Sequence, residues 1–141
     1  MSGDCHVCKL DKTAKDDAIV YRDDTWMAAS PIDVPGWFML FTHQHNDGLW
    51  TLTEQEAVEF GRLSHALSAV LEQVCDAERV YLMYQGENTL HFHALLVARG
   101  ADVPVEWRGP APITKANEMV APEESRRLAA EVKAALAARL G

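Results

Sequence analysis

The sequence predicts an α+β fold: a roughly five-stranded antiparallel sheet with one long central helix and a second helix at the C-terminus. Short strand-like segments follow one another along the chain, mostly with brief connections between them. Such neighbours favour antiparallel pairing, because a parallel pair needs a long crossover. Two other segments repeat apolar residues every three or four positions, which is typical of helices. At 141 residues the chain is long enough for one core, so we expect a single domain over residues 1–141.

The expected strands are defined by apolar or alternating runs bounded by turn residues. They are residues 18–22, 25–29, 37–42, 79–84 and 90–97. Asp23 and Asp24 form the turn of the first hairpin, and residues 85–88 form the turn of the last one. Two prolines and a glycine make residues 30–36 an irregular segment.

The long helix is predicted to begin at Thr53, because Thr53-Glu54-Gln55-Glu56 is a capping box. It should end near residues 75–77. The second helix should begin at Pro122, since proline suits the first helical position and the acidic residues after it suit the helix dipole. The charged segment 9–17 is expected to be a solvated loop, and residues 100–121 a loop or short strand over the sheet.

Charge and hydropathy exclude several classes of function. A net charge of −8 argues against nucleic-acid binding, which needs clustered Lys and Arg. The sequence has no apolar run long enough to cross a membrane and no signal-peptide pattern, so we expect no membrane partner and a cytoplasmic location. In that compartment Cys5 and Cys8 are better explained as metal ligands or free thiols than as a disulfide. Cys75 ends an apolar helical pattern and is expected to be a small buried residue.

Two motifs that are far apart in the sequence suggest a metal site. Cys5 and Cys8 have the two-residue gap of a metal knuckle. His91 and His93 should lie on one face of the last strand, together with Leu95, because side chains alternate along a strand. Two thiolates, His91 and one more histidine, either His43 or His45, would complete a tetrahedral zinc site and leave His93 free for chemistry.

The order of these features resembles the histidine triad (HIT) family over about residues 5–110. The sequence is most similar to the zinc-containing bacterial branch of that superfamily, which also includes galactose-1-phosphate uridylyltransferase. The resemblance implies a HIT-like fold and a homodimer that joins two sheets. It also implies a structural zinc ion, and the zinc ligands that it implies are Cys5, Cys8, His45 and His91.

The resemblance further implies chemistry at the α-phosphate of a nucleotide or nucleotide conjugate. His93 corresponds to the family's nucleophile, which would form a covalent nucleotidyl-histidine. An imidazole is mostly neutral at pH 7 and can attack phosphorus without an external base. The implied enzyme is a nucleotide hydrolase or nucleotidyltransferase, for example a diadenosine polyphosphate or nucleoside phosphoramidate hydrolase.

Two positions depart from the family pattern. Leu95 stands where the third histidine is expected, and leucine can neither bind phosphate nor protonate a leaving group. Trp37 stands where many members have a histidine that faces the phosphates. Losing such a donor commonly costs about a hundred- to a thousandfold in rate. The alternative function is therefore a catalytically weak or inactive, zinc-stabilised nucleotide-binding protein.

Six further residues are candidates for nucleotide binding by their position in the pattern: Trp26, Ile32, Asp33, Asn88, Thr89 and Arg99. Trp26 and Ile32 would form a wall for the base, and Asp33 would contact the ribose. The turn residues Asn88 and Thr89 would donate to phosphate, and Arg99 would pair with a phosphate or carboxylate. Each also has a simpler explanation: core apolar residues, turn formers and a surface charge.

Overall fold

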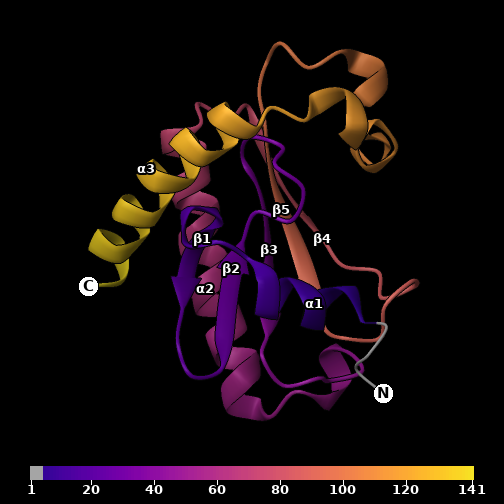
Figure 1. The fold of residues 1–141 in the computed structure, drawn as a ribbon, viewed down its shortest axis with the longest axis vertical. Coiled ribbons are helices and arrows are strands. Elements are labelled where there is room, and N and C mark those ends of the chain that lie inside the picture. Colours follow the sequence, from indigo (N-terminus) through magenta and orange to yellow (C-terminus); the bar gives the residue numbers. More distant parts are fainter. Residues whose placement is uncertain (1–4) are drawn as a thin grey trace.

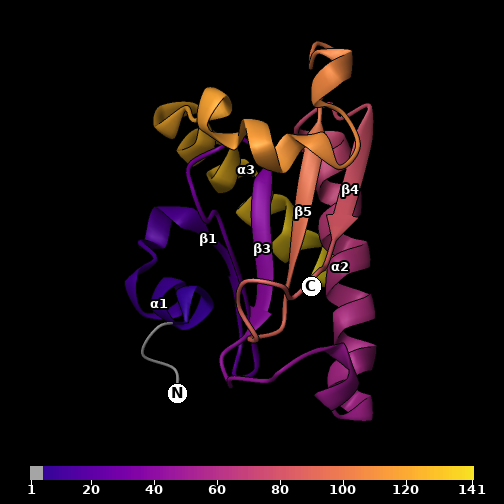
Figure 2. The same ribbon diagram turned by 90° about the vertical axis from the view of Figure 1, so that its right-hand side faces the viewer.

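The structure, a computed structural model that describes residues 5–141, is a five-stranded antiparallel sheet with helices on both faces (Figures 1 and 2). The sheet order is β1-β2-β3-β5-β4. The strands are β1 (Ile19–Arg22), β2 (Trp26–Ala29), β3 (Trp37–Thr42), β4 (Arg79–Met83) and β5 (His93–Arg99). All neighbouring strands pair antiparallel, which confirms the predicted fold class.

The two predicted helices begin where their sequence signals place them. In α2 (Glu54–Val74), the Thr53 hydroxyl accepts a hydrogen bond from the Glu56 N–H, and the Glu56 carboxylate accepts one from the Thr53 N–H. These reciprocal bonds satisfy two N–H groups that the first turn leaves without helical partners. The C-terminal helix, α3 (Pro122–Leu140), begins at its proline. None of the helices within residues 5–141 is long and apolar enough to span a bilayer.

A third helix, α1 (His6–Thr13), occupies residues that were expected to form a loop. The prediction of a loop over residues 9–17 is wrong for residues 9–13. Cys5 caps this helix, since its sulfur accepts a hydrogen bond from the Cys8 N–H at 3.3 Å. Val7 is buried, and it belongs to the same apolar cluster as Met27 and Phe41 of the sheet. A short apolar stripe with a sulfur cap therefore outweighs the polar composition of the segment.

The two faces of the sheet are covered differently. On one face, α2 and α3 enclose the main core, which includes Phe38, Phe92 and Leu96. On the other face, α1 covers the β1–β3 side, and Figure 2 shows α1 and α2 on opposite sides of the sheet. Residues 105–119, here called the roof segment, hold two short 3-10 helices, Val105–Trp107 and Ala111–Met119. Ala116 and Met119 of the roof segment pack near Trp37 and Val97, toward the end of the sheet away from His93.

The last strand begins later than predicted, at His93 instead of Leu90. Ahead of it, the Phe92 N–H donates to the Asn46 carbonyl, which is not part of the ladder. His93 and Leu95 keep the predicted alternation, because they pair with Phe41 and Met39 of β3. His91 lies before the strand, so strand alternation does not set the direction of its ring. Its buried ring is held by contacts with other elements.

Candidate metal centre and histidine cavity

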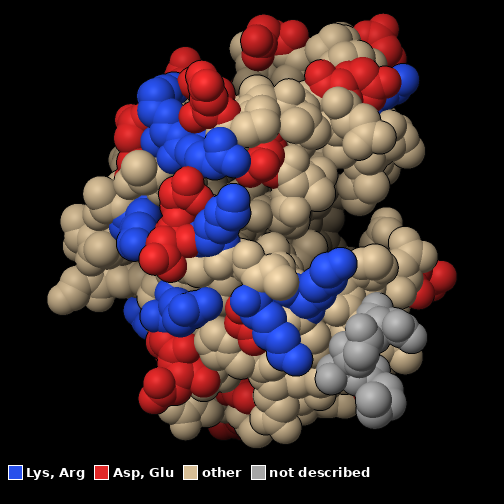
Figure 3. Space-filling view, viewed as in Figure 1, with Lys and Arg blue, Asp and Glu red and all other residues tan. Residues whose placement is uncertain are grey.

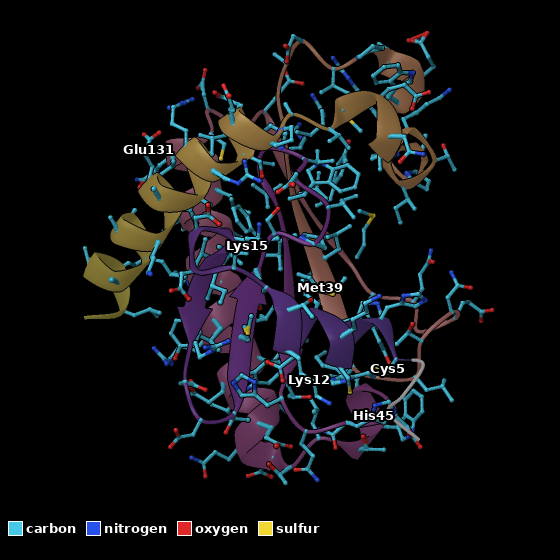
Figure 4. The ribbon with its side chains drawn as sticks, viewed as in Figure 1. Cys5, Lys12, Lys15, Met39, His45 and Glu131 are labelled. Atoms are coloured by element: carbon cyan, nitrogen blue, oxygen red, sulfur yellow. The ribbon has the colours of Figure 1, made fainter. Side chains whose placement is uncertain are left out.

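Four side chains from three separate segments meet at the lower end of the sheet. Cys5 and Cys8 come from the start of α1, His45 from the loop after β3, and His91 from the approach to β5. Their ligand atoms all lie within 4.8 Å of one another. Figure 4 shows Cys5 and His45 close together there, below Met39 on the same side of the sheet. The structure thus brings together all four predicted zinc ligands.

The distances suit a tetrahedral metal ion. The Nδ1 atom of His91 lies 3.4 Å from Cys5 Sγ and 3.3 Å from Cys8 Sγ, and His45 Nδ1 lies 3.5 Å from Cys8 Sγ. A tetrahedral zinc ion would hold sulfur and nitrogen ligands about 3.6 Å apart. The single lone pair of His91 Nδ1 cannot accept hydrogen bonds from two thiols at once. A metal ion among the four atoms accounts for this convergence.

The His91 ring is oriented for metal binding by the backbone. Its Nε2–H donates to the Thr42 carbonyl at 2.5 Å, and the residue is 1% exposed. This bond fixes the proton on Nε2 and leaves the Nδ1 lone pair facing the two sulfur atoms. Burial lowers the pKa of His91, which also favours the neutral, ligating form.

The thiols need a compensating positive charge. Burial raises the pKa of the Cys8 thiol, and the hydrogen bond and charge of Cys5 raise it further. Two neighbouring buried thiolates would be costly without a cation, whereas a bound metal ion deprotonates a coordinating thiol outright. The donor set of two cysteines and two histidines is that of structural zinc sites.

His43, the other histidine considered for the metal, points elsewhere. Its Nδ1 is 2.9 Å from the Asp11 carboxylate, and its Nε2–H donates to the Asp23 carbonyl at 2.9 Å. Both ring nitrogens are therefore occupied by α1 and by the β1–β2 turn. His43 ties these elements to the end of β3, beside the loop that carries His45.

His93 lines a separate cavity of about 180 Å³ on the same face of the sheet. Its Nδ1–H donates to the His91 carbonyl at 2.6 Å. With the proton fixed on Nδ1, the lone pair remains on Nε2, which has no hydrogen-bond partner among the described residues. The arrangement leaves Nε2 free to act as a nucleophile or as a hydrogen-bond acceptor. We call this space the His93 cavity.

Two of the predicted nucleotide-binding residues reach this cavity. The 85–89 turn, which includes Asn88 and Thr89, forms one side of it. The other side is apolar and consists of Met39, Met83, Leu95 and Ile113. Sequence reasoning missed Met39, Met83 and Ile113. Alternation along the strands could have placed the two methionines beside Leu95, whereas no local signal brings Ile113 to the site.

The other four candidates lie away from His93. Trp26 is in the main core, stacked on Phe60 with ring centroids 5.9 Å apart, on the opposite face of the sheet. Ile32 and Asp33 belong to the loop that leads into the far end of β3, where the Asp33 carbonyl accepts a hydrogen bond from the Ala121 N–H. The structure therefore does not bring these three residues to the His93 cavity.

Arg99 ends β5, six residues beyond His93, and a strand spans about 20 Å over that length. It is buried and forms an ion pair with Glu78, and it donates to the Tyr81 hydroxyl. It is neither the surface charge of the simpler explanation nor a group in contact with the His93 cavity. Its partners are Glu78, immediately before β4, and Tyr81, in the middle of that strand.

The charged surface is distributed unevenly around the site. On the face seen in Figure 3, side chains of both signs alternate over α3, whereas mostly uncharged atoms surround the hollow below the roof segment. No Lys or Arg is among the residues that line the His93 cavity, within the part of the chain that the structure describes. Glu87 is the one charged residue of that lining unless His93 is protonated.

Comparisons with known proteins were informative at the level of structure. No protein-family model and no curated protein matches the sequence. Solved structures do match, and their sequences are far diverged. A hypothetical histidine triad nucleotide-binding protein from Sulfolobus tokodaii is 15% identical, covers 95% of this chain and 93% of its own, and gives a TM-score of 0.73.

Two further structures bear on the site. A zinc-bound histidine triad family protein from Mycobacterium smegmatis is 17% identical, with 99% of this chain and 97% of that chain covered and a TM-score of 0.69. A uridylyltransferase mutant is 18% identical and has a TM-score of 0.68; the match covers 97% of this chain but only 48% of that one. All three share the fold of this chain.

Proposed function

We propose that this chain, which has the histidine triad fold, is a nucleotide hydrolase or nucleotidyltransferase that acts at an α-phosphate through a covalent nucleotidyl-histidine on His93. The observation that carries the proposal is the hydrogen bond from His93 Nδ1–H to the His91 carbonyl. It leaves the Nε2 lone pair available beside a cavity large enough for a phosphoryl group. The names of the structurally similar proteins, one nucleotide-binding and one a uridylyltransferase, support the same reaction class.

The proposed reaction has two displacements at phosphorus. The Nε2 lone pair of His93 forms a bond to the α-phosphorus while the bond from phosphorus to the leaving group breaks. The oxygen of water or of an acceptor alcohol then forms a new bond to phosphorus and releases a proton to solvent, while the His93–phosphorus bond breaks and its electron pair returns to Nε2. Two easier steps thus replace one difficult displacement. The His91 carbonyl keeps the ring oriented in both steps, and Asn88 and Thr89 are proposed to contact the phosphate.

Cys5, Cys8, His45 and His91 would hold the zinc ion. Bound there, zinc would supply structural rigidity, since four protein ligands leave no open position for a substrate. The residue that carries the His93-orienting carbonyl, His91, is itself one of these ligands, so the metal centre would hold that carbonyl in place. We place the protein in the cytoplasm, where the two thiols would stay reduced.

The test is turnover of a panel of nucleotide conjugates by zinc-loaded protein. The panel contains diadenosine polyphosphates, a nucleoside phosphoramidate, adenylyl sulfate and a nucleotide sugar. We expect at least one substrate to be converted, and His93→Ala to lower its kcat by about a thousandfold or more, with zinc content and fold unchanged. His65→Ala is the matched control, because His65 is exposed on α2 and should leave turnover unaltered. Normal turnover by His93→Ala would rule out the proposal.

A second candidate function is nucleotide binding without conversion. Leu95 favours it, because it puts an apolar side chain beside His93, where negative charge would develop during phosphoryl transfer. Trp37 does not reach this place, since it is buried opposite Val97 at the other end of the sheet. Saturable binding of a nucleoside monophosphate to wild-type protein, with no product from any member of the panel, would establish this alternative in place of the enzyme.

We also propose a homodimer formed through β4. This strand is at one end of the sheet order and pairs only with β5 in the described chain. A groove of about 500 Å³ runs along this strand, and it is lined by residues 80–85 and by Pro110 and Ile113 of the roof segment. Leu82 is 52% exposed on the strand. An apolar edge strand with unpaired backbone groups is suited to pairing with a second copy.

A further inference from the structure

A second cavity, of about 300 Å³, lies toward the opposite end of the sheet from His93. It is bounded by the start of β3, the end of β5, the roof segment and the first turns of α3, which meet in the upper part of Figure 1. Most of its lining is apolar and includes Val34, Trp37, Val97, Met119 and Leu128. Its volume is at the lower end of the range for small-molecule sites, so this space, here called the Arg99 cavity, suits one small ligand.

Arg99 brings an incompletely bonded cation to this lining. Its Nη1 donates to the Glu78 carboxylate and, at 3.4 Å, to the Gly100 carbonyl, and its Nε–H donates to the Tyr81 hydroxyl at 3.3 Å. A guanidinium has five N–H groups, so the two N–H groups of Nη2 remain. They have no hydrogen-bond partner within residues 5–141, although Arg99 is only 8% exposed. Nη2 is not among the fully buried side-chain atoms, so a ligand can reach it, and an acceptor there would be stabilising.

The charges around Arg99 favour an anion of low charge. Glu78 is shared between Arg99 and Arg108, whose Nη1 lies 3.7 Å from the same carboxylate, so the two arginines leave one positive charge in excess. Two carboxylates also line the cavity, and neither cancels that charge in the interior. The Glu124 carboxylate is paired with an arginine of its own helix, and Asp102 is exposed, where water screens its charge. One buried excess charge beside an apolar wall suits a monoanion better than a polyphosphate.

We propose that the Arg99 cavity binds a small monocarboxylate with a short apolar chain. The carboxylate accepts hydrogen bonds from Nη2 of Arg99, and the chain packs against Trp37, Val97 and Met119. Bonds from a guanidinium to a carboxylate are among the stronger hydrogen bonds, and each methylene group buried in the cavity adds to the affinity. The Arg99 cavity and the His93 cavity share no lining residue in the described part of the chain, so this site is independent of the function proposed for His93.

The first experiment is a calorimetric titration of zinc-loaded protein at pH 7 with butanoate, pentanoate and hexanoate. We expect the Kd to fall by about fourfold for each methylene group that is added. Hexanol and hexylammonium have the same chain without the negative charge, and we expect each to bind at least about tenfold more weakly than hexanoate. Equal binding of hexanol would overturn the inference, because Arg99 would then contribute nothing. Displacement of hexanoate by an equal concentration of inorganic phosphate would also overturn it.

Two variants test the two parts of the site separately. Arg99→Lys keeps a cation for Glu78 but removes Nη2, and we expect the Kd of hexanoate to rise by about tenfold or more. Arg79→Lys is the matched control, because Arg79 is exposed at the start of β4 and does not line the cavity. Met119→Trp leaves Arg99 in place and fills the cavity from the roof segment, so it should weaken hexanoate binding to a similar extent. Its control is Val105→Trp, at a position of the roof segment that is 75% exposed and outside the cavity.

A third measurement locates the bound carboxylate. Cys75 lines the Arg99 cavity, so saturating hexanoate should slow the reaction of its thiol with a small thiol reagent severalfold, as followed by mass spectrometry of zinc-loaded protein. His93→Ala should bind hexanoate with the wild-type Kd. Loss of binding in His93→Ala, or a wild-type Kd in both Arg99→Lys and Met119→Trp, would overturn the inference. Neither result would bear on the function proposed for His93, which is measured by turnover.

Discussion

At the residue scale, two histidines two positions apart are given opposite proton arrangements by backbone carbonyls. The Thr42 carbonyl accepts the Nε2–H of His91, which leaves Nδ1 for the metal group. The His91 carbonyl accepts the Nδ1–H of His93, which leaves Nε2 for the cavity. The two rings of the His-x-His motif therefore leave different nitrogens free, since the free nitrogen of each ring depends on the acceptor that the other nitrogen meets.

The metal ligands can be tested individually. Cys8→Ser replaces a thiolate with a weak zinc ligand, and we expect zinc affinity to fall by at least about a hundredfold. At a zinc concentration about a hundredfold above the wild-type Kd, this change would lower the free energy of unfolding by at least about 2.3 kcal/mol. Metal analysis and denaturant titration with and without zinc would measure both effects.

Cys75→Ser provides the matched control for that prediction. Cys75 lies at the end of α2, outside the four-residue metal group, and burial raises the pKa of its thiol to about 11. This variant should keep full zinc content. If Cys8→Ser also kept it, with unchanged stability, the assignment of the ligands would be incorrect.

At the element scale, the β1–β2 turn is organised by Asp23. One carboxylate oxygen accepts hydrogen bonds from the Thr25 and Trp26 N–H groups, and the other accepts one from the Tyr21 hydroxyl. Burial by itself would raise the pKa of Asp23, but the bond from Tyr21 and the two backbone bonds together lower it. The Asp23 carbonyl also holds His43, which joins the turn to the strand end before His45.

Asp23→Asn should therefore destabilise the protein in a pH-dependent way. At pH 7 we expect a loss of about 1–2 kcal/mol, since the amide cannot accept all three hydrogen bonds. The folded pKa lies below the unfolded value of about 3.9, so the carboxylate's contribution is complete above that pH. It is lost as the pH falls through the lower folded value, and the gap between the two proteins should then close.

Urea unfolding at pH 7, 5 and 3 would measure this gap. Asp24→Asn is the control, because Asp24 is the exposed neighbour in the same turn and makes no hydrogen bond or ion pair through its carboxylate within residues 5–141. A pH-independent difference between wild type and Asp23→Asn would contradict the role assigned to the carboxylate.

At the scale of the whole molecule, the two faces of the sheet carry different features. The face under α2 and α3 holds the main core, and the other face holds the metal group and the His93 cavity. Both candidate sites thus lie on the side that α1 and the roof segment only partly cover. The free edge of β4 borders the same cavity, because Met83 belongs to both.

Disruption of this edge should separate the proposed dimer. Leu82→Lys places a charge on the exposed edge strand, and we expect it to weaken self-association by about tenfold or more. Sedimentation velocity over a concentration series would measure the change, with Val105→Lys as a control on an exposed apolar residue of the roof segment. A wild-type protein that sediments as a monomer at all concentrations would disprove the dimer.

The sequence by itself determined the features that depend on local signals. The capping box placed the start of α2, and proline placed the start of α3, since both act through bonds within one turn. Alternating apolar runs identified the strands. The spacing of the cysteines and histidines suggested a metal site, and the resemblance to the histidine triad family implied the four residues that the structure brings together. The fold class and the resemblance to histidine triad proteins are confirmed at the level of structure.

Only the tertiary structure decided what depends on contacts between distant segments. Trp26 lies in the core and Arg99 pairs with Glu78 because the register of the sheet and the packing of α2 and β4 place them there. Ile113 reaches the His93 cavity because the roof segment folds back over the sheet, which no local pattern encodes. The direction of each ring, and with it the nitrogen that His91 and His93 each leave free, was decided by the carbonyl that each ring meets in the folded chain.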